Sequence, residues 1–358
     1  MVAGDWHSEL HEVAVYDAFV RLGHHVERFS WHQYFFPSKG LLKTVDEIVR
    51  RAQNKFLYGP LLTRLNRHLV ERVSVFAPDV LFVYRGTHIS ARTLEKIKLL
   101  LPACVLVGYN NDDPFAPGHP PWLWRHFLKA IPHYDLMLAY RSANIPEFLS
   151  AGAKRVELLR SWFIPERNHP IDISNDDNIK KYSCDVIFIG HYEPDGRVSY
   201  LEEIVRRGWN FRLFGPGYDW DPVIRKSPEL QDQIPVHLLW GEDYNNALCS
   251  SKIALCFLSK LNRDTYTRRC FEIPATGTMM LAEYTEDLAS MYREGEDAEF
   301  FRSPTEMMKK IEYYLTDDAS RHKLAAAGLL RVHADGHDVD SRMHQLINWV
   351  EDVRERQK

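Results

Sequence analysis

The sequence predicts an α/β protein made of two Rossmann-like domains in tandem, because short apolar runs alternate with segments of helical period along most of the 358 residues. A chain of this length exceeds what one hydrophobic core usually serves. The alternation stops between Ser161 and Ser183, where Pro, Asn, Asp and Ser predominate. We therefore predict a first domain at 1–165, a linker at 166–182, a second domain at 183–337 and a final helix at 338–358.

Parallel strands are predicted where the apolar runs are short, rich in β-branched residues and apolar on both faces. They are 79–84, 103–109 and 134–140 in the first half, and 184–190, 210–215, 234–240, 252–258 and 278–284 in the second. Strands that take turns with helices form right-handed βαβ units. Ligands bind outside the carboxyl ends of such strands, so two facing sheets predict a central cleft lined by functional residues.

Two amphipathic helices frame this pattern. The first is SELHEVAVYDAFVRLG, where Gly23 is placed to end the helix and the apolar positions are Leu10, Val13, Ala14, Ala18 and Leu22. The last begins near Asp340, and its apolar positions are Met343, Leu346, Ile347 and Val350.

Composition excludes several classes of protein. The hydrophobic fraction of 45% indicates a globular chain, and a formal net charge of −4 without long blocks of one sign argues against a nucleic-acid surface. The five cysteines form no C-x-x-C pair, so we expect reduced, mostly buried thiols. With no apolar run of eighteen residues and no leader pattern, we expect a cytoplasmic protein without a transmembrane segment, for which peripheral membrane association stays open.

The stretch RDTYTRRCFEIPATG, residues 263–277, predicts an anion site. The N–H groups at the start of a helix attract an anion, and Arg268 or Arg269, directly after Thr267, adds full charge. A diphosphate suits such a site. Glu272 has paired oxygens that accept from both hydroxyls of a ribose. The alternative is that Glu272 and Arg269 pair across a helix turn on a solvated face.

Two other strand ends supply candidates. Gly190 ends one predicted strand, and His191 follows it. Arg197 lies where the next helix would start, and an arginine in that position can reach a phosphate over the edge of the sheet. A solvated loop histidine and an exposed arginine are the alternatives. Gly215 begins GPGYDW, where Trp220 replaces the third glycine of G-x-G-x-x-G, so a nicotinamide enzyme is not predicted.

Asp112 and Asp113 follow the strand at 103–109. Adjacent carboxylates can hold Mg²⁺ or Mn²⁺ on a diphosphate. Asp-Asp-Pro is also a turn or helix-cap signal, and we rank a cap or acceptor-binding role ahead of a metal. Neither zinc-ligand spacing nor a nucleophile elbow occurs in the sequence, so no metal ligand and no Ser-His-Asp triad is predicted.

Four stretches in order along the chain resemble the CgeB-like (spore maturation protein CgeB) glycosyltransferases. They are YNNDDP, YDLMLAYRSANIPEFLSAGAKRVELL, CDVIFIGHYEPDGR, and the long segment that runs from RRCFEIPATG at residue 268 to KLAAAG at residue 328. The resemblance covers most of the chain. It implies a GT-B fold, in which two Rossmann-like domains face a cleft and the C-terminal helix crosses back to the first domain.

The resemblance also implies roles for single residues. The E-x7-E motif of related retaining enzymes falls on Asp264 and Glu272, so Asp264 would face the donor sugar and Glu272 the ribose, although aspartate replaces the first glutamate. Arg269 and Arg197 would hold the diphosphate.

In the first domain, GDWHSE matches the loop that follows the family's first strand. We therefore predict that Gly4, Asp5 and Trp6 border the acceptor. Asp112 or Asp113 would orient or deprotonate the acceptor hydroxyl.

The implied reaction transfers a sugar from a nucleotide-diphosphate sugar to an acceptor hydroxyl, with retention and without a metal or other cofactor. The acceptor would be a glycan, a lipid-linked saccharide, a protein or a small molecule. Two alternatives remain: a metal-dependent transferase that uses Asp112 and Asp113, and a non-catalytic GT-B-like nucleotide-binding protein.

Overall fold

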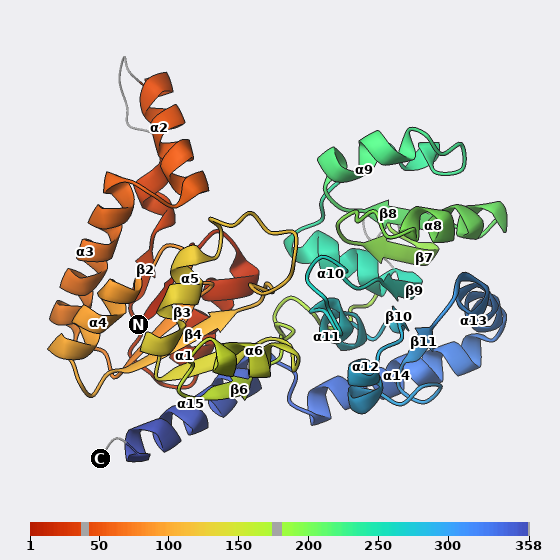
Figure 1. The fold of residues 1–358 in the computed structure, drawn as a ribbon. Coiled ribbons are helices and arrows are strands. Elements are labelled where there is room, and N and C mark those ends of the chain that lie inside the picture. The colour runs from red at the N-terminus through yellow and green to blue at the C-terminus, as the bar shows by residue number, and fades with distance from the viewer. Residues whose placement is uncertain (37–42, 174–180, 357–358) are drawn as a thin grey trace. The chain divides into compact units, whose positions relative to one another are not determined.

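A computed structural model of the chain describes residues 1–36, 43–173 and 181–356. They form two compact units, each with its own parallel sheet and hydrophobic core (Figure 1). Unit 1 comprises Met1–Ser161 and Val339–Lys358, and unit 2 comprises Trp162–Asp338. The predicted linker at 166–182 therefore begins inside unit 2, and its residues 174–180 lie outside the described part of the chain.

In unit 1 the described residues form a six-stranded sheet in the order β2-β1-β3-β4-β5-β6, and every pairing is parallel. The strands are β1 Val2–Gly4, β2 Arg28–Ser30, β3 Val80–Tyr84, β4 Val105–Asn110, β5 Leu136–Ala139 and β6 Val156–Leu158. Three of them confirm the predicted runs at 79–84, 103–109 and 134–140. The short β1 lies where the resemblance placed a first strand, leading into GDWHSE. The strands β2 and β6 were not predicted, because three residues are too few to show an apolar run.

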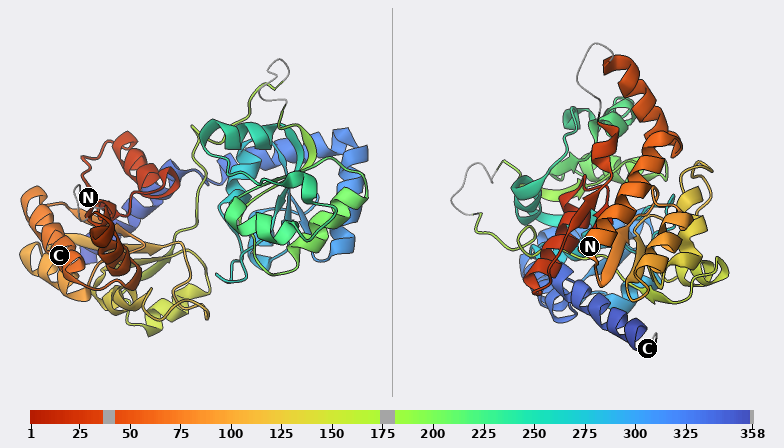
Figure 2. Two further views of the ribbon diagram at one scale, coloured as in Figure 1. Left: turned by 90° about the horizontal axis from the view of Figure 1, so that it is seen from above. Right: turned by 90° about the vertical axis from the view of Figure 1, so that its left-hand side faces the viewer.

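Helices lie on both faces of this sheet (Figure 2). The α-helices are α1 Ala14–Arg21, α2 Lys43–Phe56, α3 Pro60–Phe76, α4 Ala91–Leu100, α5 Arg125–Ala130, α6 Asn144–Ser150 and α15 Val339–Arg356, with short turns η1 Glu9–Val13, η2 His32–Phe35 and η3 Ile131–His133. The helix predicted at 8–23 is interrupted, because η1 is a π-helical turn with a non-helical His11. Gly23, at φ 88°, follows its end as predicted.

The C-terminal helix α15 belongs to unit 1, where it packs against α1. Its predicted apolar positions Met343 and Leu346 are 0% and 1% exposed. Arg21 Nη2 donates to Asp340 Oδ1 at 2.6 Å near the start of α15, and Arg354 Nη2 to Asp79 Oδ1 at 2.9 Å near its end. Apolar burial and these ion pairs together fasten the helix to the unit.

In unit 2 the described residues form a five-stranded sheet in the order β11-β10-β9-β7-β8, again with parallel pairings. The strands are β7 Cys184–Ile189, β8 Phe211–Phe214, β9 Ser251–Cys256, β10 Met279–Glu283 and β11 Glu299–Phe301. The helices are α8 Arg197–Arg206, α9 Gly217–Ile224, η4 Gln231–Gln233, α10 Gly241–Cys249, α11 Arg269–Ala275, α12 Glu286–Met291, α13 Pro304–Thr316 and α14 Asp318–Ala334. No helix in the described part of the chain is both long and apolar enough to cross a membrane.

One predicted strand is wrong. Residues 234–240 run as irregular chain, because Val236 is buried but Leu238 and Trp240 are 48% and 55% exposed. Pro235 has no N–H to give to a ladder. The segment still contributes one bond to a strand end, since the His237 carbonyl accepts from the Gly215 N–H at 3.0 Å.

We expect Met343→Ala to lower the free energy of unfolding of unit 1 by about 2–5 kcal/mol, because a buried side chain is lost and a cavity remains. Leu330→Ala on α14 is the matched control, since Leu330 is 73% exposed. Its effect should stay within about 0.5 kcal/mol. Urea unfolding with hydrogen exchange resolved to each unit measures both, and equal losses would contradict the packing of α15.

Candidate functional site

Two glycines shape the carboxyl edge of the sheet in unit 2. Gly190 follows β7 and donates to the Phe214 carbonyl at 2.9 Å, and Gly215 follows β8. A Cβ on Gly190 would lie 2.0 Å from Arg269 Nη1, and one on Gly215 would lie 2.2 Å from the Gly190 carbonyl oxygen. Both positions therefore need glycine because a guanidinium and a neighbouring backbone come very close.

Arg269, the first residue of α11, is fixed over this edge. Its Nη1 donates to the Ile189 carbonyl at 2.6 Å and its Nη2 to the Phe257 carbonyl at 3.2 Å, and the guanidinium lies 5.5 Å from the Phe188 ring centroid. In the part of the chain that the structure describes, Arg269 has no ion pair. The protein thus holds a partly exposed positive charge with neutral groups, which leaves that charge available to an anion.

Glu272 lies one turn further along α11 and is 5% exposed. Its Oε2 accepts from the Tyr244 hydroxyl on α10 at 2.7 Å. Burial and the nearby Glu272 carboxylate raise the pKa of Tyr244 well above its ordinary value, so the phenol stays protonated and donates. The alternative in which Glu272 pairs with Arg269 on a solvated face is wrong, because the carboxylate is buried and bonded elsewhere.

Arg167 joins this group although sequence reasoning did not select it. Burial lowers the pKa of its guanidinium, while the charges of Glu272 and Tyr244 oppose that shift, which places all three groups within electrostatic reach of one another. Arg268 also acts on Arg167, and its own guanidinium lies 5.5 Å from the Trp162 ring centroid. Nothing in the sequence around Arg167, a Pro- and Asn-rich segment, indicates that this arginine lies near Glu272. The sequence around Tyr244 gives no such indication either.

Arg197 does not present its charge to a ligand, so its predicted phosphate role is wrong. The residue is 3% exposed, and its Nε and Nη2 donate to the two carboxylate oxygens of Asp195 at 2.8 and 2.6 Å. Its Nη1 donates to the His191 carbonyl at 2.8 Å. Burial alone would raise the pKa of Asp195, but the bonds and charge of Arg197 lower it below its usual range. The pair therefore fixes the loop after β7.

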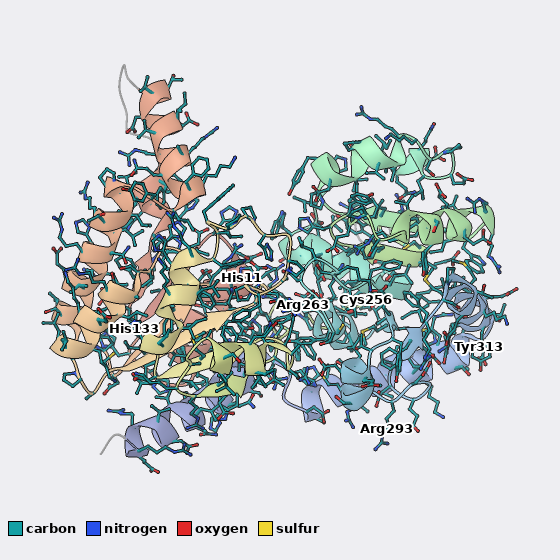
Figure 3. All side chains as sticks on the ribbon, in the orientation of Figure 1. His11, His133, Cys256, Arg263, Arg293 and Tyr313 are labelled. Carbon is teal, nitrogen blue, oxygen red and sulfur yellow. The ribbon has the colours of Figure 1, made fainter. Side chains whose placement is uncertain are left out.

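The other predicted residues of this edge lie on loops. The exposed His191 is bonded through Nδ1 to Asp219 Oδ2 at 2.8 Å. Asp264 and Thr267 lie on the segment that joins β9 to α11, after Cys256 and Arg263 (Figure 3). The Asp264 N–H donates to the Ser259 carbonyl, and the Thr267 carbonyl accepts from Cys270. The structure thus places both beside the start of α11 without assigning either a ligand.

The cysteines agree with the prediction of reduced thiols. All five are free, four are buried, and Cys249 is partly exposed. Cys256 Sγ lies 3.6 Å from Cys270 Sγ beneath α11. Cys256 and Cys270 are therefore buried, unpaired thiols next to α11.

In unit 1, the loop after β1 is built on a buried carboxylate. Glu12 is 3% exposed, its Oε1 accepts from the Asp5 N–H at 2.9 Å, and a Cβ on Gly4 would lie 2.2 Å from its Cγ. Trp6 adopts φ 61° and donates from Nε1 to the Phe29 carbonyl at 3.1 Å. The predicted acceptor residues thus lie at the carboxyl edge of this sheet. Glu12 was missed, although an acid among the apolar residues of a predicted helix was a usable signal.

Asp112 and Asp113 do not converge as a metal pair. Asp113 is 0% exposed, and its Oδ1 accepts from the Phe115 N–H at 3.0 Å and from Asn144 Nδ2 at 2.9 Å. Asp112 Oδ2 instead pairs with Arg85 Nη2 at 2.8 Å. Among the described residues, no group of three His, Cys, Asp or Glu side chains could hold a metal ion. The turn reading is confirmed for Asp113, and its predicted catalytic role is wrong because the carboxylate is buried and bonded.

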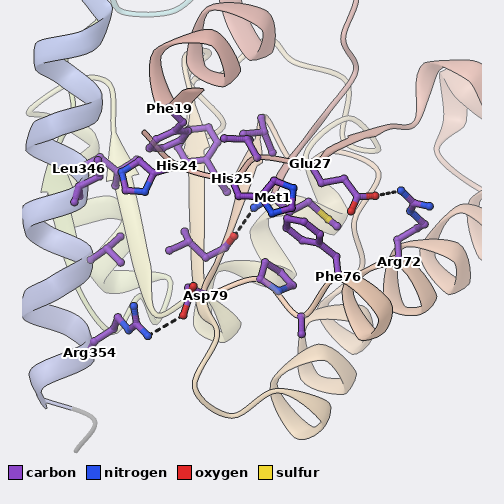
Figure 4. Close-up of a pocket in the computed structure, with 18 of the residues that line it drawn as sticks. Met1, Phe19, His24, His25, Glu27, Arg72, Phe76, Asp79, Leu346 and Arg354 are labelled. Carbon is purple, nitrogen blue, oxygen red and sulfur yellow. Dashed lines mark hydrogen bonds and ion pairs between the residues drawn. The ribbon is translucent and has the colours of Figure 1, made fainter. Parts of the chain in front are cut away.

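A cavity of about 540 Å³ opens elsewhere in unit 1, at the amino ends of β1 and β3 (Figure 4). Glu27 pairs with Arg72, and Asp79 with Arg354, among the residues that line it. Ligands of doubly wound sheets bind at the opposite, carboxyl ends. We therefore assign this cavity no part in the candidate site.

Comparison with solved structures identifies the fold. Sucrose-phosphate synthase of Thermosynechococcus elongatus aligns over 98% of both chains with a TM-score of 0.67 at 9% identity. A glycosyltransferase of Rickettsia africae aligns over 98% of this chain and 97% of its own, with a TM-score of 0.66 at 10% identity. The chain has the GT-B fold. HepE of Anabaena, solved with UDP and glucose, shares this GT-B fold over 94% of this chain and 88% of its own, with a TM-score of 0.62 at 12% identity.

The sequence itself matches one family model, described as "Glycosyl transferase-like", over residues 197–348. That range begins at α8 and includes α11, so it covers most of unit 2, which carries Arg269 and Glu272. No curated protein matches the sequence significantly. The resemblance to the CgeB-like branch stays a prediction.

Arg197→Gln should destabilise unit 2 by about 3–5 kcal/mol, because it leaves Asp195 without its charged partner in a nearly buried position. The control is Arg206→Gln on the same helix, where the arginine side chain is 47% exposed. Exposed pairs contribute about 1 kcal/mol or less. Chemical denaturation measures both variants. Similar losses would show that Arg197 does not fix the loop.

Glu12→Gln should stabilise unit 1 at neutral pH. Burial raises the pKa of Glu12 against the opposing backbone hydrogen bonds, so the folded state binds its proton more tightly than the unfolded state. The wild type consequently gains stability as pH falls from neutrality toward the unfolded glutamate pKa of about 4.3. The melting temperature of the variant should exceed that of the wild type at pH 7.5, and this difference should shrink toward pH 4.5. Glu9→Gln, at an exposed position, is the control, and a difference that grows in acid would refute the account.

Proposed function

We propose that this protein is a glycosyltransferase that moves a sugar from a nucleoside-diphosphate sugar to an acceptor hydroxyl. The observation that carries the proposal is the joint placement of Arg269 and Glu272 on one turn of α11, at the carboxyl edge of the sheet in unit 2. A fixed positive charge and a buried carboxylate one turn apart suit a diphosphate and a ribose. The family model over 197–348 and the UDP complex of HepE support the same substrate class.

Arg269 is assigned to the leaving group. When the bond from the anomeric carbon to the diphosphate breaks, negative charge builds on the diphosphate oxygens. A guanidinium that two backbone carbonyls already hold stabilises this charge without reorganisation. Arg268, which is partly exposed, is assigned to the same diphosphate. The proposal therefore gives charge neutralisation to arginines and includes no metal.

Glu272 is assigned to the ribose. Its carboxylate accepts hydrogen bonds only, and Tyr244 binds Oε2, so Oε1 is the oxygen that we direct at the ribose hydroxyls. A hydrogen bond to a charged acceptor contributes about 1.5–3 kcal/mol, which corresponds to roughly ten- to a hundredfold in affinity. Tyr244 keeps this carboxylate in place and is a positioning residue.

The remaining roles come from the sequence resemblance. Asp264, on the loop before α11, is assigned to the hydroxyls of the donor sugar. Asp112, which is partly exposed and paired with Arg85, is assigned to the acceptor hydroxyl, while Gly4, Asp5 and Trp6 border the acceptor. Retention at the anomeric carbon completes the proposal, with the leaving phosphate as acceptor of the hydroxyl proton.

The test is calorimetric binding of UDP, GDP, ADP and dTDP, followed by turnover of the glucose conjugate of the base that binds. Glu272→Ala should weaken nucleotide binding by about ten- to a hundredfold. Tyr244→Phe should weaken it less, because the carboxylate remains. Neither variant should alter binding of the 2′,3′-dideoxy nucleotide, which has no ribose hydroxyl. Turnover should persist in EDTA.

Matched controls are available on the same elements. Glu242→Ala lies on α10 like Tyr244, at an exposed position, and Tyr218→Phe removes a hydroxyl from a side chain that is 76% exposed. Both should bind nucleotide as the wild type does. Unchanged affinity in Glu272→Ala and Arg269→Ala would overturn the site. Tight nucleotide binding without turnover of any conjugate would favour a non-catalytic nucleotide-binding protein. Turnover that EDTA abolishes would favour a metal-dependent transferase.

A further inference from the structure

The helix α2 of unit 1 is amphipathic, and most of its apolar side is exposed rather than packed against the rest of unit 1. Val45, Ile48, Val49, Ala52 and Phe56 recur at helical spacing and share one face, here named the outward face of α2. On this face Val45 is 60%, Ile48 63%, Val49 48% and Phe56 47% exposed. Figure 1 shows α2 projecting beyond α3 at one end of unit 1. A soluble helix ordinarily turns such a stripe inward.

The polar face of α2 makes hydrogen bonds with the rest of unit 1, while on the outward face the Phe56 ring contacts the Trp122 ring, with centroids 5.4 Å apart. Arg50 Nη1 donates to the Tyr34 carbonyl at 2.8 Å, and Asn54 Oδ1 bonds with Nε2 of the buried His88 at 2.8 Å. Gln53 Oε1 accepts from the Leu61 N–H at 3.0 Å. These bonds come from three positions that are opposite or beside the apolar stripe. They fix the rotation of the helix, so the exposure of the outward face follows from the way α2 is attached.

Charge indicates what covers the outward face. The helix α2 contains four basic residues, Lys43, Arg50, Arg51 and Lys55, and two acidic ones, Asp46 and Glu47, a local balance of +2 in a chain of net charge −4. Arg51 and Lys55 are exposed on the flank of the apolar stripe, where Arg51 also pairs with Glu47 one turn earlier. Tyr58, just beyond the helix, is 75% exposed. Apolar residues bordered by cations and an aromatic side chain are the pattern of helices that lie in a membrane interface.

We propose that the outward face of α2 binds the surface of an anionic lipid bilayer. The apolar side chains would enter the boundary between headgroups and acyl chains, while Arg51 and Lys55 extend to the lipid phosphates. A helix of 14 residues is about 21 Å long, which gives the contact the length of several lipid headgroups. This inference concerns unit 1 and does not depend on the transferase assignment of unit 2.

The test uses the full chain and sedimentation with vesicles of phosphatidylcholine alone or with a quarter of phosphatidylglycerol. The wild type should bind the anionic vesicles, bind the neutral ones much less, and lose binding in 0.5 M salt. Ile48→Glu with Val49→Glu should weaken anionic binding at least tenfold. The matched control is Val75→Glu with Leu330→Glu, which adds the same charge at positions 85% and 73% exposed. It should bind within twofold of the wild type.

Other occupants of the face give different results. If a second copy covers it, sedimentation velocity without lipid will show a dimer that Ile48→Glu with Val49→Glu dissociates. If another part of the chain covers it, the same variant will melt several degrees below the wild type. Either result overturns the proposal, as does a wild type that leaves anionic vesicles in the supernatant. A monomer with an unchanged melting temperature and lipid-dependent loss of binding supports it.

Discussion

The close approach of the Arg269 guanidinium to the backbone at Gly190 is the constraint on which the candidate site depends. Any side chain at position 190 would occupy the space of Nη1, so the arginine can take this position only because residue 190 is glycine. Two strand-end carbonyls then hold the guanidinium in place without cancelling its charge. The position of α11 follows, because Arg269 is its first residue, and with α11 comes the position of Glu272.

The two units use charge at their strand ends in different ways. In unit 2, Arg197 and Asp195 neutralise each other to hold a loop, while Arg269 keeps its charge. In unit 1 the acids at the sheet edge are bonded within the protein: Asp113 to a turn and Asp112 to Arg85. Both carboxylates therefore serve the protein's own structure, and the EDTA experiment decides the metal-dependent alternative.

Sequence reasoning predicted the fold well where local composition decides structure. The long apolar strands and the final helix were recognisable, because burial on two faces and helical spacing are visible in the residues themselves. The three-residue strands β2, β6 and β11 were not, since their stability comes from pairing with neighbours. In the site, the sequence left open whether Glu272 lies on a solvated face, and the structure shows that its carboxylate is buried. Arg197 was misassigned because sequence cannot show that Asp195, two positions away, takes its charge.

The division of the chain into units has a consequence for synthesis on the ribosome. Unit 2 is one continuous segment, whereas unit 1 includes α15, which leaves the exit tunnel only after all of unit 2. Until that helix emerges, the surface of α1 that receives it stays open to water and to chaperones. The second unit can therefore reach its folded state first, although its residues are made later than most of the first.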